Sequence, residues 1–326
     1  MTTAIALARP NGCLPPVPVD HVVDDPTTIR SMARAHGPYF MPARYLINAG
    51  AANDAKGGSE TVEVPAHLIG PVWRGDWAIE GRPLVDGAQD LLTLAPFVAG
   101  ARQMCGPAAV VDPQQVFINL TTPMPGSGFA HVDIPEFVGH DRSDAPDWLL
   151  QAMGSSRAFE DVRITVVTAV SWFHSGERGY FRYWPQGIDN PSIRHENMWN
   201  TAVVGDNDFM FHKVERVGRR DQLRVEGLTI DSTLDHDGAD WQVLEGGSSL
   251  ATYTDDDVRI SLSWKARVYP SPDAKEAAEA GDGALSDDTV LARFEEALGE
   301  PLAAADLTSP ALRDQLQARF PGYAAG

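Results

Sequence analysis

The chain has 326 residues, of which 43% are hydrophobic and 22% are charged, so wholesale disorder is excluded and one large domain or two ordinary ones are expected. Acidic residues outnumber basic residues 45 to 26, and the formal net charge of −19 disfavours binding to nucleic acid or to anionic membranes. The sequence lacks the apolar run of a membrane span and the basic leader of a secretion signal, and its two cysteines cannot form a disulfide framework. We therefore expect a cytoplasmic protein that handles a small molecule.

The N-terminal region predicts an irregular arm followed by helices. Its first 30 residues are rich in Pro, Asp and Thr. One helix is expected over residues 27–36, with Asp25 or Thr27 available as its cap, and a second over Asp90–Met104. We assign residues 1–113 to this arm and its helices, packed on the core.

From about residue 114 to residue 270, short β-rich runs alternate with Gly, Pro and Asp clusters. Many short strands separated by turn residues are typical of a sandwich, a jelly roll or a barrel. The fold class is therefore mainly β with flanking α-helices. The predicted strands are Val116–Thr121, Val162–Phe173, Tyr180–Trp184, Thr201–Val204, Asp208–Val214, Leu223–Ile230, Trp241–Leu244, Leu250–Thr254 and Val258–Tyr269.

After Pro270 the pattern becomes helical again. A helix is expected from Ser286 to Glu300, and a last one from Ser309 to Arg319. Residues 271–326 form a helical extension that either covers the barrel or builds a homodimer face, and the sequence does not decide between these. We expect all three regions to make one compact unit.

The segment that runs up to Asp133 carries the most informative chemistry. Residues two apart on a strand point to the same face, so His131 and Asp133 can bind one metal ion. One more histidine from a distant strand would complete a set of two histidines and one carboxylate, which leaves one face of the metal open and is typical of non-haem Fe(II) oxygenases. The alternative is a surface loop in which the spacing arises by chance.

Three histidines compete for the third ligand position. His212 ends a strongly apolar run, where an imidazole needs a partner, although a hydrogen-bonded core histidine would fit the same pattern. His174 follows a predicted strand and resembles a hairpin or pocket residue, and His236 lies in an acidic stretch and resembles a turn residue. We predict His212 as the ligand. The remaining histidines have no ligand-like neighbours: His21, His36, His67, His140 and His195.

The last predicted strand alternates polar and apolar residues. Arg259, Ser261 and Ser263 share one face, and the residues between them are apolar. Turned into a barrel, this polar face suits a buried carboxylate, because Arg offers an always-charged bidentate fork and Ser adds a donor. The alternative is an amphipathic edge strand with a solvated Arg.

Together, the His-x-Asp pair, the later His and the Arg-x-Ser strand resemble the Fe(II)/2-oxoglutarate-dependent oxygenase superfamily over roughly residues 114–270. Asn119 and the Pro-Gly that follows resemble the run-up to the first ligand. Residues 170–185 resemble the central hairpin, and the stretch from residue 200 to residue 214 resembles the strand with the distal histidine. The resemblance implies a double-stranded β-helix, which is a squashed jelly roll.

The resemblance also implies an activity and its cofactors. Fe(II), 2-oxoglutarate and O2 would together oxidise a C–H bond of a small molecule, by default to an alcohol, with succinate and CO2 as co-products. Asp133 argues against halogenation, because the halogenating branch lacks this carboxylate; desaturation, epoxidation and ring formation stay open. The implied metal ligands are His131, Asp133 and His212, and the implied 2-oxoglutarate residues are Arg259, Ser261 and Asn119.

One spacing departs from the family pattern. The gap from His212 to Arg259 is longer than usual, so we interpret residues 219–257 as an insertion, a hairpin over the mouth of the site. Arg224, twelve residues after His212, is then a competitor for the carboxylate. We prefer Arg259 because the whole Arg-x-Ser strand matches.

The substrate itself leaves little trace in the sequence. Aromatic residues gather near the predicted mouth and are candidates for a pocket wall, while the negative charge argues against the branch that repairs DNA and RNA. Two alternative functions stay open: a metal-dependent cupin-type enzyme that does not use 2-oxoglutarate, and a non-catalytic jelly-roll binding protein. The predicted pocket residues are Phe129, Trp172, His174, Tyr180 and Trp184.

Overall fold

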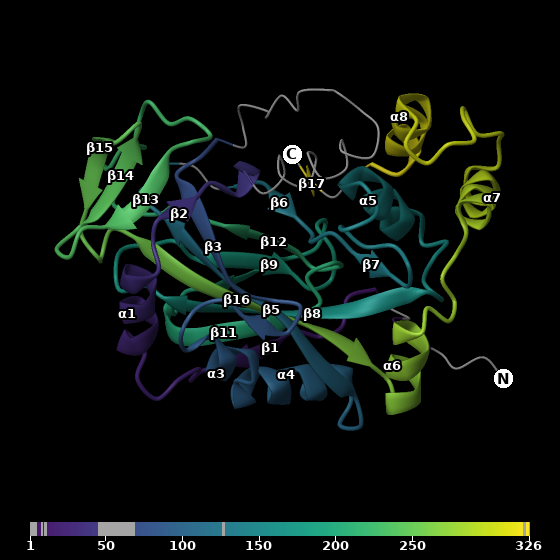
Figure 1. Ribbon diagram of the computed structural model, residues 1–326, viewed down its shortest axis with the longest axis horizontal. Coiled ribbons are helices and arrows are strands. Elements are labelled where there is room, and N and C mark those ends of the chain that lie inside the picture. The colour runs from purple at the N-terminus through teal and green to yellow at the C-terminus, as the bar shows by residue number, and fades with distance from the viewer. Residues whose placement is uncertain are drawn as a thin grey trace.

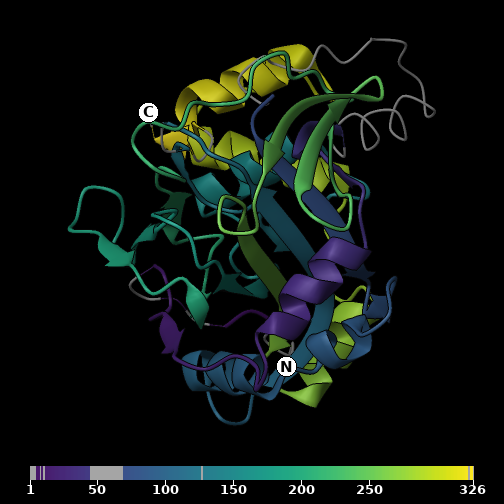
Figure 2. The ribbon, with the colours of Figure 1, turned by 90° about the vertical axis from the view of Figure 1, so that its left-hand side faces the viewer.

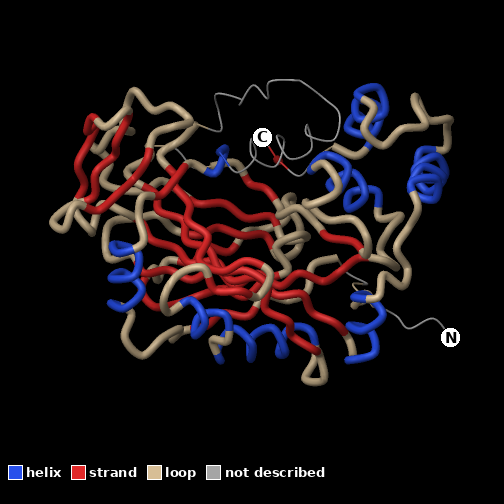
Figure 3. The backbone as a smooth tube through the Cα atoms, in the orientation of Figure 1, coloured by secondary structure: helices blue, strands red, loops and turns tan. Residues whose placement is uncertain are grey.

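Two antiparallel sheets face each other in the computed structural model, and the helices lie at the periphery (Figure 1, Figure 3). The structure describes residues 5–7, 9, 12–44, 69–125, 128–321 and 324–325. His67 and Gly126, both considered in the sequence, lie outside these residues. No helix in the described ranges is long and apolar enough to cross a membrane.

Eight strands form the core and are divided between a major and a minor sheet. In spatial order, the major sheet contains β11 (Trp199–Gly205), β8 (Arg163–Phe173), β16 (Arg259–Tyr269) and β5 (Val110–Thr121). The minor sheet contains β10 (Ile193–His195), β9 (Phe181–Trp184), β12 (Phe211–Val214) and β6 (Ala130–His131). The chain crosses repeatedly from one sheet to the other, and sequence-distant strands become neighbours. This is the jelly-roll arrangement, and the predicted double-stranded β-helix is confirmed.

The N-terminal region contributes strands that its sequence did not predict. β3 pairs with β5, and β1 pairs with β11, so both widen the major sheet. The expected boundary after residue 113 falls within β5. The strands of the N-terminal region are β1 (Val17–Val19), β2 (Tyr39–Phe40), β3 (Val72–Ile79) and β4 (Arg82–Pro83). Two further short strands lie later in the chain: β7 (Glu136–Phe137) and β17 (Ala324–Ala325).

Residues 219–257 extend the major sheet at its edge. They form a three-stranded meander rather than the single hairpin expected (Figure 2). Its first strand, β13, pairs with β2 and so connects the meander to the major sheet. The predicted strand Leu223–Ile230 is wrong, because this segment is an irregular loop with a bend at Gly227, whose φ of 77° lies outside the strand region. The meander strands are β13 (Thr233–His236), β14 (Trp241–Glu245) and β15 (Ser248–Tyr253).

The helix expected over Asp90–Met104 is in fact two helices, α3 (Ala88–Leu92) and α4 (Ala95–Cys105). Pro96 lacks an N–H group and is tolerated only in the first turn of a helix, so a new helix begins there. Both helices contact the major sheet, and they lie below it in Figure 1.

The other helices flank the core. α1 (Thr27–Ala35) matches the prediction, and the Asp25 carboxylate accepts a hydrogen bond from the Thr27 N–H at 2.9 Å. α7 also matches at its start, because Ser286 caps it, whereas α5 and α6 were not predicted. α5, α7 and α8 share one apolar cluster. Their bounds are Asp147–Ser156 (α5), Pro272–Glu279 (α6), Asp287–Leu298 (α7) and Pro310–Arg319 (α8).

The two faces of β16 meet different surroundings, as its alternating sequence predicts. On the apolar face, the Trp264 indole N–H donates to the Leu92 carbonyl of α3 at 2.8 Å, and its ring packs on Phe97 of α4. On the polar face, Ser261 lies opposite Trp172 of β8, whose ring packs on Phe181 of the minor sheet. The polar face therefore looks into the space between the two sheets.

Candidate metal centre

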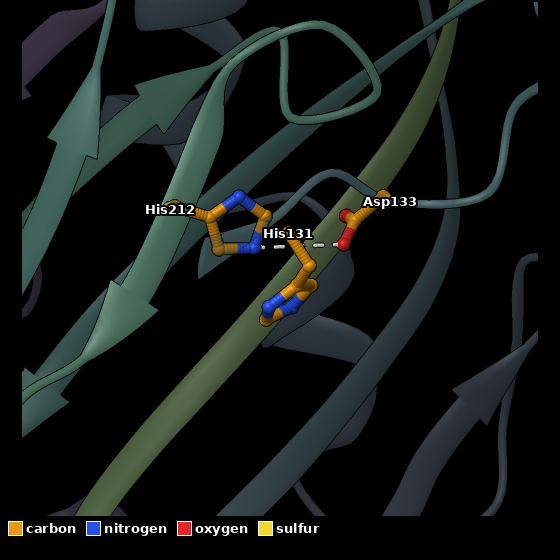
Figure 4. Close-up of side chains that lie close together, drawn as sticks. All are labelled: His131, Asp133 and His212. Atoms are coloured by element: carbon orange, nitrogen blue, oxygen red, sulfur yellow. Dashed lines mark ion pairs between the residues drawn. The ribbon is translucent and has the colours of Figure 1, made fainter. Parts of the chain in front are cut away.

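The structure brings His131, Asp133 and His212 together between the sheets (Figure 4). His131 on β6 lies directly opposite His212 on β12, and their ring centroids are 4.5 Å apart. One ligand atom from each of the three side chains lies within 4.8 Å of the other two. The competing histidines, His174 and His236, belong to other parts of the fold and are not in this cluster.

Backbone hydrogen bonds orient both imidazoles in the same way. The Nδ1 atom of His131 lies 3.1 Å from the Phe129 carbonyl, and Nδ1 of His212 lies 2.9 Å from the Met210 carbonyl. A carbonyl oxygen only accepts, so each Nδ1 carries the proton and each Nε2 presents a lone pair. This arrangement is typical of histidines that bind metal through Nε2.

Asp133 is held by its backbone and by both of its carboxylate oxygens. β6 ends at His131, so strand pairing does not place Asp133; its N–H donates instead to the Asn207 carbonyl at 2.8 Å. Oδ1 lies 3.6 Å from His212 Nε2 (Figure 4), while Oδ2 accepts a hydrogen bond from Lys265 Nζ at 2.6 Å. The two oxygens therefore face different partners.

The protonation states suit a divalent cation. Burial lowers the pKa of His212 to about 4, although the Asp133 carboxylate acts in the opposite direction, so the imidazole is neutral near pH 7. Burial also favours the neutral form of Asp133, but the Lys265 ammonium and the two histidines outweigh burial and hold its pKa well below the usual range. A set of two imidazoles and one carboxylate fits Fe(II) or another divalent first-row ion.

Arg259 is a buried cation with spare hydrogen-bonding capacity. Its side chain is 1% exposed; Nε donates to the Gly179 carbonyl at 2.7 Å and Nη1 donates to Ser261 Oγ at 3.1 Å. Nη2 is buried without a hydrogen-bond partner, and the described residues place no carboxylate in an ion pair with this guanidinium. Burial alone lowers the pKa of Arg259 to about 9. Asn119 lies opposite Ser261 in the strand register, so the three predicted 2-oxoglutarate residues are neighbours.

The competing Arg224 lies on the surface. Its Nη2 donates to the Ile69 carbonyl at 2.8 Å, and its side chain is exposed. Arg224 therefore does not face the space between the sheets that Arg259 enters.

The predicted pocket residues lie in different environments. His174 and Tyr180 line a cavity of about 910 Å³, together with Trp199 and neighbouring loop residues. Trp172 is fully buried and stacks on His195 at 4.7 Å. The other two are Phe129, which is 54% exposed, and Trp184, which packs under Lys213.

His174 is unusual among the residues of this cavity. The residue is 3% exposed, and among the described residues its ring nitrogens have no well-aligned hydrogen-bond partner, although the backbone of Val258 and Glu177 lies close enough to favour the protonated form. Burial lowers its pKa to about 4, and the positive charge of Arg259 contributes in the same direction. His174 is thus a buried neutral imidazole near the guanidinium.

A buried ion network supports the metal centre and was not predicted from sequence. Arg9 donates to the two carboxylate oxygens of Asp206 at 2.8 and 3.1 Å, and Arg163 contacts Asp208 at 2.9 Å. Burial and the neighbouring Asp208 raise the pKa of Asp206 to about 7. Asp206 and Asp208 flank Asn207, whose carbonyl accepts the hydrogen bond from the Asp133 N–H, so the network anchors both sides of this contact.

Lys265 is the residue near the metal ligands that sequence reasoning missed. It lies on the same face of β16 as Arg259, Ser261 and Ser263, because residues two apart on a strand share a face. This spacing could have predicted that Lys265 enters the space between the sheets. Its contact with Asp133 depends on a distant segment, so the pattern alone did not reveal it.

Solved structures that are similar to this chain include 2OG-Fe(II) oxygenases, whereas no protein-family model and no curated protein matches it. An oxidoreductase of the 2OG-Fe(II) oxygenase family from Burkholderia pseudomallei is 13% identical, with 78% of this chain and 85% of that chain covered and a TM-score of 0.38. A prolyl hydroxylase from Trichoplax adhaerens is 9% identical, with 85% and 88% covered and a TM-score of 0.37. HygX from Streptomyces hygroscopicus, with nickel, 2-oxoglutarate and hygromycin B bound, is 10% identical, with 78% and 83% covered and a TM-score of 0.38.

Proposed function

We propose that this chain is an Fe(II)- and 2-oxoglutarate-dependent oxygenase that hydroxylates a C–H bond of a small organic molecule. One observation carries this proposal: a single jelly roll contains both a cluster of two histidines and one aspartate and a buried Arg259 that has no carboxylate partner among the described residues. The cluster fits a metal, and the unpaired guanidinium fits the carboxylate of a co-substrate.

The metal would be held by Nε2 of His131, Nε2 of His212 and the carboxylate of Asp133. Bound Fe(II) would supply the activation of O2, coupled to oxidative decarboxylation of 2-oxoglutarate to succinate and CO2. The protein's part is to keep both imidazoles correctly turned, through their Nδ1–H bonds to backbone carbonyls, so that Nε2 of each ring faces the site.

Arg259 would bind the distal carboxylate of 2-oxoglutarate. Its Nη2 is the donor that such a carboxylate needs, while the Ser261 hydroxyl accepts from Nη1 at 3.1 Å and donates to the Asn119 carbonyl at 3.4 Å. A structural arginine usually has its donors satisfied by the protein, so a buried donor without a partner favours a ligand at this position. This point distinguishes the proposal from a cupin-type enzyme in which Arg259 would be purely structural.

The test is a visible absorption spectrum of the metal-free protein, mixed anaerobically with Fe(II) and then with 2-oxoglutarate. We expect a weak charge-transfer band that requires both additions. His212→Ala should lose the band because it loses iron, and Arg259→Met should keep iron but need far more 2-oxoglutarate. Arg224→Met is the matched control and should behave as the wild type. Admitting air should then produce succinate in the wild type.

Each other outcome has a definite meaning. Iron binding without a band would identify a metalloenzyme that does not use 2-oxoglutarate. Absence of iron binding would remove the proposal altogether. Loss of the band in Arg224→Met, with Arg259→Met unaffected, would move the carboxylate site to the surface arginine.

A further inference from the structure

Lys265 contacts one of the two carboxylate oxygens of Asp133 and leaves the other to the metal ligands. Lys265 Nζ lies 2.6 Å from Oδ2, and Thr168 Oγ1 lies 3.4 Å from the same oxygen. Oδ1 lies 3.6 Å from Nε2 of His212. One carboxylate oxygen therefore contacts a cation on the major sheet, and the other faces a histidine on the minor sheet.

The position of Lys265 is determined by the sheet. Lys265 lies in the middle of β16, opposite Thr168 of β8 and Gln115 of β5, and the pairing with β5 shifts register directly after it. Such irregularities often occur beside active sites, where they redirect a side chain. The Lys265 and Asp133 side chains are each 22% exposed, so their pair is better shielded than a surface ion pair.

We propose that Lys265 is a positioning residue that makes Asp133 a ligand through Oδ1 alone. A carboxylate can bind a divalent ion through one oxygen or through both, and binding through both would occupy a position that the three-residue site leaves open. The ammonium group engages Oδ2, so only Oδ1 is presented beside His212. Partners of this kind, which bind a metal ligand rather than the metal, determine its orientation.

The inference rests on the metal site of the proposed function but not on the use of 2-oxoglutarate. It can therefore be tested with Ni(II) alone, a probe that binds such nitrogen and oxygen ligands, by measuring its affinity for the full-length metal-free protein. Lys265→Met retains most of the aliphatic stem without the charge, and Lys265→Arg retains the charge. Lys275→Met is the control, because Lys275 pairs with Asp112, which is not a metal ligand.

We expect Lys265→Met to weaken Ni(II) binding by roughly 10- to 100-fold, the usual effect of removing a residue that orients a metal ligand. Lys265→Arg should recover most of this loss, and Lys275→Met should bind as the wild type. A crystal structure of the Ni(II)-loaded wild type should show Asp133 bound through Oδ1, with Oδ2 on Lys265. The same structure of Lys265→Met should show a rotated carboxylate or one bound through both oxygens.

Unchanged or tighter Ni(II) binding by Lys265→Met, with Asp133 in its original orientation, would overturn the role of Lys265 and leave the metal site intact. Absence of Ni(II) binding by the wild type would remove both the metal site and this inference. A dependence on Lys265 in a protein that makes no succinate would support the inference while contradicting the proposed use of 2-oxoglutarate. If Lys265→Met does not fold, as judged by circular dichroism, Lys265→Gln takes its place with the same expected loss.

Discussion

His131 and His212 lie directly across from each other on neighbouring strands of the minor sheet, with ring centroids 4.5 Å apart. Strand pairing therefore sets the distance between the two imidazoles, and the backbone carbonyls of Phe129 and Met210 set their orientation. Asp133 is placed differently, through Asn207 and Lys265. The centre thus combines two ligands held by the sheet with one held by tertiary contacts.

Replacing His212 should abolish stoichiometric metal binding, whereas replacing His174 should not. His212→Ala removes one of the three ligand atoms that converge within 4.8 Å, and His174 is outside that cluster. Anaerobic calorimetric titration with Fe(II) compares the two variants with the wild type. Full binding by His212→Ala together with loss in His174→Ala would reverse the assignment of the third ligand.

Binding of 2-oxoglutarate should stabilise the folded protein only when Arg259 is present. With Ni(II) bound, 2-oxoglutarate at 100 times its dissociation constant should raise the free energy of unfolding of the wild type by about 2.7 kcal/mol. The same concentration should have little effect on Arg259→Met, and Arg259→Lys should be intermediate because it keeps the charge but loses the fork. Thermal melts with and without the ligand measure this. A full shift in Arg259→Met would exclude Arg259 as the carboxylate partner.

The metal-free protein should lose stability as the pH falls from 6.5 towards 4, in part because of His174. Burial lowers the pKa of His174 from 6.5 to about 4, so in this range the unfolded chain binds a proton that the folded protein does not. Above pH 6.5 the imidazole is neutral in both states and does not lower the free energy of unfolding. Between pH 7 and pH 5 its protonation in the unfolded chain lowers that free energy by about 2 kcal/mol. Urea unfolding at both pH values should show a loss smaller by this amount in His174→Gln. An equal loss in both proteins would mean that His174 is protonated in the folded state.

Removing Arg9 should destabilise the fold and weaken metal binding together. Arg9→Met removes both donors from the buried Asp206, whose raised pKa then lets it take up a proton near pH 7, and a buried polar group left without its partner costs about 1–3 kcal/mol. The turn that holds Asp133 through Asn207 then loosens. Adding Asp206→Asn should restore part of the stability in urea unfolding above pH 7, because the amide cannot become a buried charge beside Asp208. A single variant as stable as the wild type would show that the N-terminal arm does not support this turn.

The sequence alone determined those features that depend on neighbours along the chain. The alternation along β16 separates an apolar face, which packs on the helices, from the polar face of Arg259 and Ser261, because successive strand residues point to opposite sides. The cap at Ser286 is local in the same sense, whereas the strand geometry expected for His131 and Asp133 was wrong, because the strand ends at His131. These patterns predicted a mainly β core and the candidate ligands, whereas the jelly roll and the choice of His212 followed from the resemblance of their combination to a known superfamily.

Only the tertiary structure decided which distant residues meet. β3 becomes a strand through its pairing with β5, and Asp133 meets Lys265 because the segment after β6 lies over the middle of β16. Arg9 reaches Asp206 in the same way, from the far end of the chain. Such contacts depend on how strands from remote parts of the chain are ordered in the two sheets. The residues next to either partner in the sequence do not show this order.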